Sequence, residues 1–122
     1  FSETCGFKII GANKSLVFIP DIDSLDGLEI EKIIKENDHL FIDGTFYNNA
    51  EVNFRDVKEI PHPFVESSVN YLNTILKEEE KGKVSFIHLN HSNPLWNKDG
   101  DEYKNVIKSG YKICDHMDKI FI

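Results

Sequence analysis

Short apolar segments alternate with amphipathic segments along this chain, and that alternation limits the fold more than any other feature. The apolar segments are too short for buried helices, and their β-branched and aromatic residues favour strands. The first two are joined by a predicted hairpin at residues 12–14. The predicted strands are residues 6–11, 15–19, 39–43, 83–89, 111–114 and 118–122.

Three of the intervening segments have the spacing of a helix with one apolar face. Residues 28–36 carry isoleucines at 30, 33 and 34, residues 65–80 carry apolar residues at 65, 69, 72 and 76, and residues 100–110 close on Gly110. Each apolar face must pack on another element. The order strand, strand, helix, strand, helix, strand, helix, strand, strand therefore predicts an α/β fold with helices packed on a mixed sheet.

Composition narrows the classes of function. The 14 basic and 21 acidic residues give a net charge of −7, which disfavours a nucleic-acid partner. No apolar run approaches the roughly 18 residues that would cross a membrane. Cys5 and Cys114 are far apart and are expected to be free thiols of a cytoplasmic protein. Since the chain starts at Phe1, we expect residues 1–122 to be a single, partial domain of a longer protein.

Polar residues collect where the predicted strands end. Asp21 follows the second strand, Asp43 ends the third, and His88 lies near the end of the fourth. His62, between two prolines, precedes a helix. Ligands of α/β sheets bind at the carboxyl ends of strands, and carboxylates and imidazoles suit zinc, manganese and iron. These four residues are therefore candidates for a metal site.

Each candidate also has a structural interpretation. Asp21, with Asp23 and Asp26, fits a turn, and so does Asp43 before a glycine. His88 fits a hydrogen-bonded histidine of the core. The remaining histidines are expected at the surface, in loops or in turns, and these are His39, His91 and His116.

A resemblance makes the prediction more specific. "LVFIPD", "HLFIDGTF", "IPHPF" and "FIHLNHSNP" occur in the order typical of the C-terminal half of metallo-β-lactamase-fold hydrolases. The chain most resembles the branch that contains the pyrroloquinoline quinone biosynthesis protein B and, more distantly, the tRNA 3′-processing endonuclease. The resemblance implies the second αβ half of a four-layer αββα fold, with a mixed sheet and helices on one of its faces.

The resemblance also implies roles for the four candidates. Asp21 would bridge two divalent metal ions, and His88 would be a further ligand. His62 would stabilise an oxyanion or protonate the leaving group, while Asp43 would orient a histidine or transfer a proton. The metals would be zinc, with manganese or iron as alternatives, and their remaining ligands would lie outside this chain, in an H-x-H-x-D-H loop.

The implied function is metal-dependent hydrolysis of a small-molecule ester, lactam or phosphodiester. The partner would be the N-terminal half of the fold, a homodimer stays open, and the chain alone is expected to have little or no activity. One alternative is a non-catalytic interaction module built on half a metallo-β-lactamase fold. Another is a small doubly wound domain in which Asp21 and Asp43 hold Mg²⁺, although a glycine-rich phosphate loop is missing.

Overall fold

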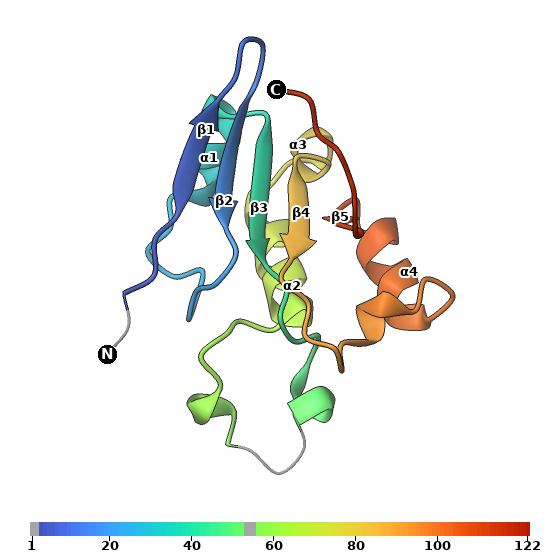
Figure 1. Ribbon diagram of the computed structural model, residues 1–122. Helices are drawn as coiled ribbons and strands as arrows, with labels where there is room; N and C mark the ends of the chain where they lie inside the picture. Colours follow the sequence, from blue (N-terminus) through green and yellow to red (C-terminus); the bar gives the residue numbers. More distant parts are fainter. Residues whose placement is uncertain (1–2, 53–55) are drawn as a thin grey trace.

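The computed structural model describes residues 3–52 and 56–122. These ranges contain one five-stranded sheet together with its helices and loops (Figure 1). The strands lie side by side in chain order, from β1 to β5. β1 pairs antiparallel with β2, and the other pairs are parallel, so the sheet is mixed, as predicted. The strands are β1 (Phe7–Ile10), β2 (Ser15–Ile19), β3 (His39–Asp43), β4 (Val84–Ile87) and β5 (Lys112–Ile113).

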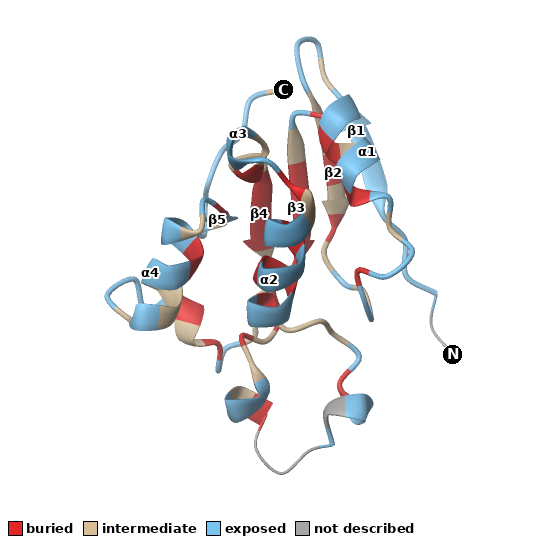
Figure 2. Ribbon diagram, turned by 180° about the vertical axis from the view of Figure 1, so that it is seen from behind, coloured by how far each residue is buried: buried red, intermediate tan, exposed pale blue. Residues whose placement is uncertain are grey.

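The helices cover one face of this sheet (Figure 2). They are α1 (Ile30–Glu36), α2 (Val65–Ile75), α3 (Glu78–Lys81) and α4 (Asp101–Lys108). The apolar faces predicted from the sequence are the ones that pack, because alternate strand residues meet the helix stripes in one core. This core includes Val17, Ile19, Leu40, Ile42, Val84 and Phe86 of the strands and Ile30, Ile34, Val65, Val69 and Leu72 of the helices.

The opposite face of the sheet carries no helix (Figure 1). The rings of Phe18 and Phe41 lie on it with centroids 6.5 Å apart, and the side chains of Phe7 and Ile9 on β1 are exposed. His39 was expected at the surface or in a loop. It instead begins β3 and is half-buried, and its burial lowers its pKa.

The predicted last strand, residues 118–122, is wrong. The chain turns after β5, where the Asp118 N–H donates to the Asp115 carbonyl, and it then runs back along the helix-free face without pairing. Its end reaches the hairpin turn, since a Cβ on Gly11 would lie 2.3 Å from the Ile122 carbonyl carbon. The segment therefore crosses this face without strand pairing, and its apolar side chains Ile120 and Phe121 remain exposed.

The helix predicted over residues 65–80 is divided. Leu76 has extended backbone, and the carboxylate of Glu80 accepts the Lys77 N–H, so a new helix, α3, starts there. The strand predicted to reach Leu89 ends at Ile87.

The long connection after β3 holds short 3₁₀ turns at Asn49–Val52 and Val57–Glu59. In the described ranges, none of the helices has the length and hydropathy needed to cross a membrane.

Candidate metal centre at the carboxyl edge of the sheet

The four predicted site residues meet at one edge of the sheet. Asp21 follows β2, Asp43 ends β3 and His88 follows β4, and these strands are parallel, so their carboxyl ends share an edge. One ligand atom from each of these three residues lies within 4.8 Å of the other two. His62 arrives from the loop before α2, with Nδ1 3.5 Å from Asp21 Oδ1 and 2.6 Å from Asp43 Oδ2. We call these four residues the edge cluster.

Asp43 is the buried centre of the edge cluster, with 0% of the residue exposed. Its Oδ1 accepts the Thr45 N–H at 2.8 Å, and its Oδ2 accepts the Ile22 N–H at 3.1 Å and the His62 imidazole at 2.6 Å. A buried carboxylate needs such donors to remain ionised. The contact to Thr45 is the predicted turn, so Asp43 both forms a turn and organises the cluster.

The contact to Asp43 determines how His62 is protonated. An ionised carboxylate only accepts hydrogen bonds, so Nδ1 of His62 is assigned the proton. The other ring nitrogen, Nε2, remains available to a ligand. The ring is held from the side by Phe46, whose centroid lies 5.8 Å away in an edge-to-face arrangement.

His88 is exposed, so its interpretation as a core histidine is wrong. Its φ of 68° lies in the left-handed region, which a residue other than glycine adopts at a cost in energy. Its Nδ1 lies 3.1 Å from Thr45 Oγ1, and its ring centroid lies 6.2 Å from that of His62. This backbone conformation turns the His88 imidazole away from β4 and toward Thr45 and His62.

Two residues that hold this edge together were not among the predicted site residues, although the family resemblance included Thr45 in its motif and implied that the Asn-rich segment after His88 would shape the pocket. The buried Asn93 donates from Nδ2 to the carbonyls of Gly44 and Thr45, at 2.8 and 3.1 Å, and accepts the Leu95 N–H at 2.9 Å. The Asn-Pro pair signals a helix start, but not this link between segments. Thr45 contacts both histidines through its hydroxyl.

Gly44 follows β3 and lies against the backbone at the end of β4. A Cβ there would lie 3.0 Å from the Ile87 carbonyl oxygen and 3.0 Å from Phe86 Cβ. The Gly44 N–H donates to that same carbonyl at 2.7 Å. Because Gly44 has no side chain, the segments that carry Asp43 and His88 can lie this close together.

The other sequence candidates lie outside the edge cluster. Asp23 and Asp26 are exposed, and the Asp26 N–H donates to Ser24 Oγ, which supports their interpretation as turn residues. His91 and His116 are exposed. Cys5 is an exposed free thiol, and Cys114 is a half-buried one whose pKa is raised by burial.

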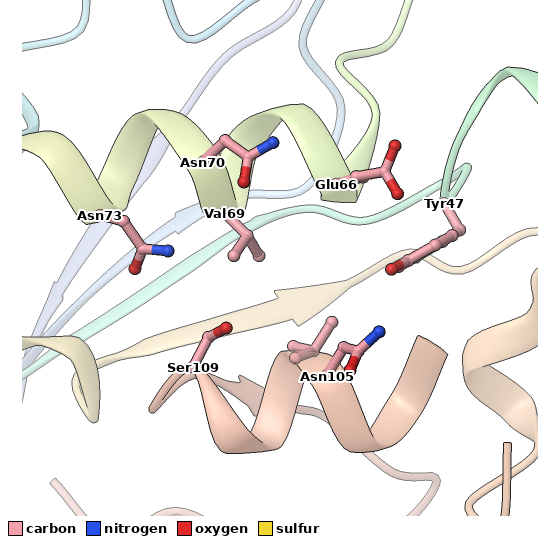
Figure 3. Close-up of a pocket in the computed structure, with 8 residues that line it drawn as sticks. Tyr47, Glu66, Val69, Asn70, Asn73, Asn105 and Ser109 are labelled. Atoms are coloured by element: carbon pink, nitrogen blue, oxygen red, sulfur yellow. The ribbon is translucent and has the colours of Figure 1, made fainter. Parts of the chain in front are cut away.

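A polar pocket lies between α2 and α4, apart from the edge cluster (Figure 3). This interhelical pocket has a volume of about 260 Å³ and contains none of the edge cluster. The pKa of Tyr47, which lines it, is raised by burial and by the nearby Glu66 carboxylate. Its other lining residues are Val69, Asn70, Asn73, Asn105, Val106 and Ser109.

The edge cluster has the chemistry of a metal site. Asp21 and His88 are exposed to solvent, whereas the Asp43 carboxylate that lies beside them is buried. A set of carboxylate and imidazole donors suits zinc and related divalent ions. Both oxygens of Asp43 already accept hydrogen bonds, so Asp21 and His88 are the better ligands and Asp43 the better support.

Comparison with known proteins points to one group of relatives. No protein-family profile matches the chain. Coenzyme PQQ synthesis protein B of Acinetobacter baumannii (strain SDF) is 26% identical over 109 residues, which are 83% of this chain and 34% of that protein. The same protein of Gluconobacter oxydans (strain 621H) is 26% identical over 118 residues, which are 93% of this chain and 38% of that protein.

A solved structure agrees with these sequence matches. The crystal structure of Zn²⁺-bound PqqB from Methylobacterium extorquens superposes with a TM-score of 0.70 at 22% identity, over 89% of this chain and 40% of that one. The chain thus spans little more than a third of the length of the curated relatives it matches. By sequence and by fold, the chain is homologous to coenzyme PQQ synthesis protein B, a metallo-β-lactamase-fold protein.

Proposed function

We propose that this chain is the C-terminal αβ unit of a metal-dependent hydrolase of the metallo-β-lactamase superfamily. The observation that carries the proposal is the convergence of Asp21, Asp43 and His88 within 4.8 Å beside the His62–Asp43 pair. Homology to coenzyme PQQ synthesis protein B supports it, as does the Zn²⁺ bound in the related PqqB structure.

Asp21 and His88 are the metal-binding residues in this proposal. Two divalent ions, zinc first and manganese or iron as alternatives, take their remaining ligands from outside these 122 residues. Such ions lower the pKa of water to about 7 and neutralise the charge that develops on a reacting carbonyl or phosphoryl group. The Asp43 contact to the Ile22 N–H fixes the backbone next to Asp21, from which the exposed Asp21 carboxylate projects.

His62 and Asp43 form the proton-transfer pair. Asp43 accepts the Nδ1 proton of His62, which orients the ring. Nε2 of His62, once it has taken up a proton, would donate that proton to the leaving group or a hydrogen bond to an oxyanion. The substrate class is a small-molecule ester, lactam or phosphodiester, and the net charge of −7 disfavours a nucleic acid.

The helix-free face of the sheet is the surface for the second αβ unit of the fold. Its apolar side chains include Phe7 and Ile9 on β1, which are exposed in this chain. Apolar sheet faces pack against one another in layered folds. We propose that this second unit supplies the remaining metal ligands, and that the chain alone has little or no hydrolase activity.

Calorimetric titration with Zn²⁺ tests the metal site. The Asp21→Asn and His88→Ala variants should each weaken binding by about 100-fold or more, because each removes a ligand. His91→Ala is the matched control, since His91 lies exposed in the same segment as His88 and outside the edge cluster. Zn²⁺ binding by His88→Ala that equals the unmodified chain would remove the basis of the proposal.

A mixing experiment tests the hydrolase assignment. The chain should turn over a generic phosphodiester or lactam only after the N-terminal part of the Gluconobacter oxydans relative is added, and His62→Ala should abolish that turnover. Turnover by the chain alone that His62→Ala abolishes would refute the need for a second unit. No turnover in the mixture, with Zn²⁺ bound, would favour a non-catalytic role.

The second candidate is a non-catalytic interaction module, which the exposed apolar side chains of β1 favour. In that case the histidines would be structural, and His62 and His88 substitutions would lower stability without any effect on Zn²⁺. The titration and the mixing experiment together separate the two functions.

A further inference from the structure

We propose that Thr45 is a positioning residue whose hydroxyl stays hydrogen-bonded to Nδ1 of His88 in either tautomer and so holds the ring for metal binding through Nε2. The part of this inference that concerns metal rests on the proposed function. The contact itself does not, because Thr45 Oγ1 lies 3.1 Å from His88 Nδ1 and 3.3 Å from His62 Nδ1. One hydroxyl thus stands between two imidazoles that come from different segments of the chain.

The backbone of Thr45 is fixed at both of its polar groups. Its N–H donates to Asp43 Oδ1 at 2.8 Å, and its carbonyl accepts the Asn90 N–H at 2.9 Å and Asn93 Nδ2 at 3.1 Å. The residue is buried, with 7% exposed. The backbone is therefore held in place, and the contacts of the hydroxyl with both histidines place it between the two rings. Its geometry is therefore suited to orient a neighbouring ring.

The proton of His62 decides which way the Thr45 hydroxyl points. Nδ1 of His62 donates to the Asp43 carboxylate at 2.6 Å, so it has no lone pair for the threonine proton. Among the partners in the described residues, His88 Nδ1 is the remaining acceptor for that proton. In the metal-free chain Thr45 O–H then donates to His88 Nδ1, and the ring proton of His88 is on Nε2.

A metal ligand needs the opposite tautomer. A histidine that binds through Nε2 carries its proton on Nδ1 and donates it to a nearby oxygen, which fixes the ring. Thr45 Oγ1 is that oxygen, since a hydroxyl can accept as readily as it donates. The hydroxyl rotates and the contact is kept, so His88 remains hydrogen-bonded in both states. An ionised carboxylate at position 45 could only accept a hydrogen bond, so it could pair with His88 in the metal-bound tautomer alone.

Thr45→Val and Thr45→Ser test this inference. Valine keeps the shape and removes the hydroxyl, whereas serine keeps the hydroxyl. Loss of an outer hydrogen bond to a ligating histidine typically costs about 10–100-fold in metal affinity. We expect that loss for Zn²⁺ binding by Thr45→Val and binding within about threefold of the unmodified chain for Thr45→Ser. Thr45→Ala gives a second hydroxyl-free variant should the valine variant fold poorly.

The imidazole ¹⁵N spectrum of the full 122-residue chain, recorded without metal and with Zn²⁺, reads the tautomers directly. In the unmodified chain and in Thr45→Ser, the His88 proton should move from Nε2 to Nδ1 on Zn²⁺ addition. Thr45→Val should shift the His88 Nδ1 signal even without metal. Unchanged His88 signals together with unchanged Zn²⁺ affinity in Thr45→Val would overturn the inference. If the chain binds no Zn²⁺ even after the N-terminal part of the Gluconobacter oxydans relative is added, the proposed function fails, and the metal-free spectra still decide the role of Thr45.

Discussion

The edge cluster and the interhelical pocket are both rich in polar side chains, but they are built differently. Polar groups at the edge come from segments that follow three different strands and from the loop before α2, and hydrogen bonds between these segments hold them. The polar helix residues that line the pocket, Glu66, Asn70, Asn73 and Asn105, are exposed. One described hydrogen bond joins α2 to the chain after α4 there, from Tyr111 OH to Asn73 Oδ1 at 2.9 Å. Bonds between segments, rather than polarity, mark the preorganised site.

The largest difference between the two regions should appear on substitution of Asp43. Asp43→Asn replaces a buried acceptor of three donors with an amide, which we expect to lower the free energy of unfolding by about 3 kcal/mol. Asn105→Ala, at an exposed position of the pocket, should change it by less than about 0.5 kcal/mol. Urea unfolding measures both. Equal effects would show that the edge is no more constrained than the pocket.

Asn93 should give the next largest effect. Asn93→Ala leaves the carbonyls of Gly44 and Thr45 without this donor and removes the cap of the following turn, at a cost of about 2 kcal/mol. It should also weaken Zn²⁺ binding, because the segments that carry Asp43 and His88 lose their link. The pocket variant Asn70→Ala is its control. An Asn93→Ala chain with normal stability would contradict the proposed link between these segments.

The smallest effect should come from Tyr111 beside the pocket. Burial, with a contribution from Glu78, raises the pKa of Tyr111 to about 12. Because this value lies above the unfolded pKa of about 10, the neutral phenol stabilises the fold fully below pH 10, and this contribution is lost as the pH rises toward 12. Tyr111→Phe should cost about 1 kcal/mol at pH 8 and less at pH 11, as measured by urea unfolding. A cost independent of pH would argue against a buried phenol.

The sequence predicted the parts of the molecule that depend on local patterns and on parallel strands. The stripe at Val65, Val69 and Leu72 packs as expected, because its spacing is helical. Asp21 and His88 meet because parallel strands end at one edge. Residues 118–122 have the composition of a strand, but their conformation depends on whether a pairing partner is present, which composition does not report.

The contacts that hold the edge cluster together could not be predicted from local sequence patterns. Asn93 contacts Gly44 and Thr45, which precede it by 49 and 48 residues. The Thr45 hydroxyl reaches His88, which follows it by 43 residues. Such contacts depend on how segments converge in three dimensions. The position of Thr45 after an acidic residue and a glycine was part of the family resemblance, but nothing in the sequence indicated that it touches two histidines.

The location of a bound metal ion tests the central claim most directly. Crystals of the chain soaked in Zn²⁺ and measured on both sides of the zinc absorption edge would place the ion by its anomalous signal. We predict a peak at the carboxyl edge of the sheet, in contact with Asp21 and with Nε2 of His88, and none in the interhelical pocket. A peak only at His91, at His116 or between α2 and α4 would contradict the assignment of the edge cluster as the metal centre.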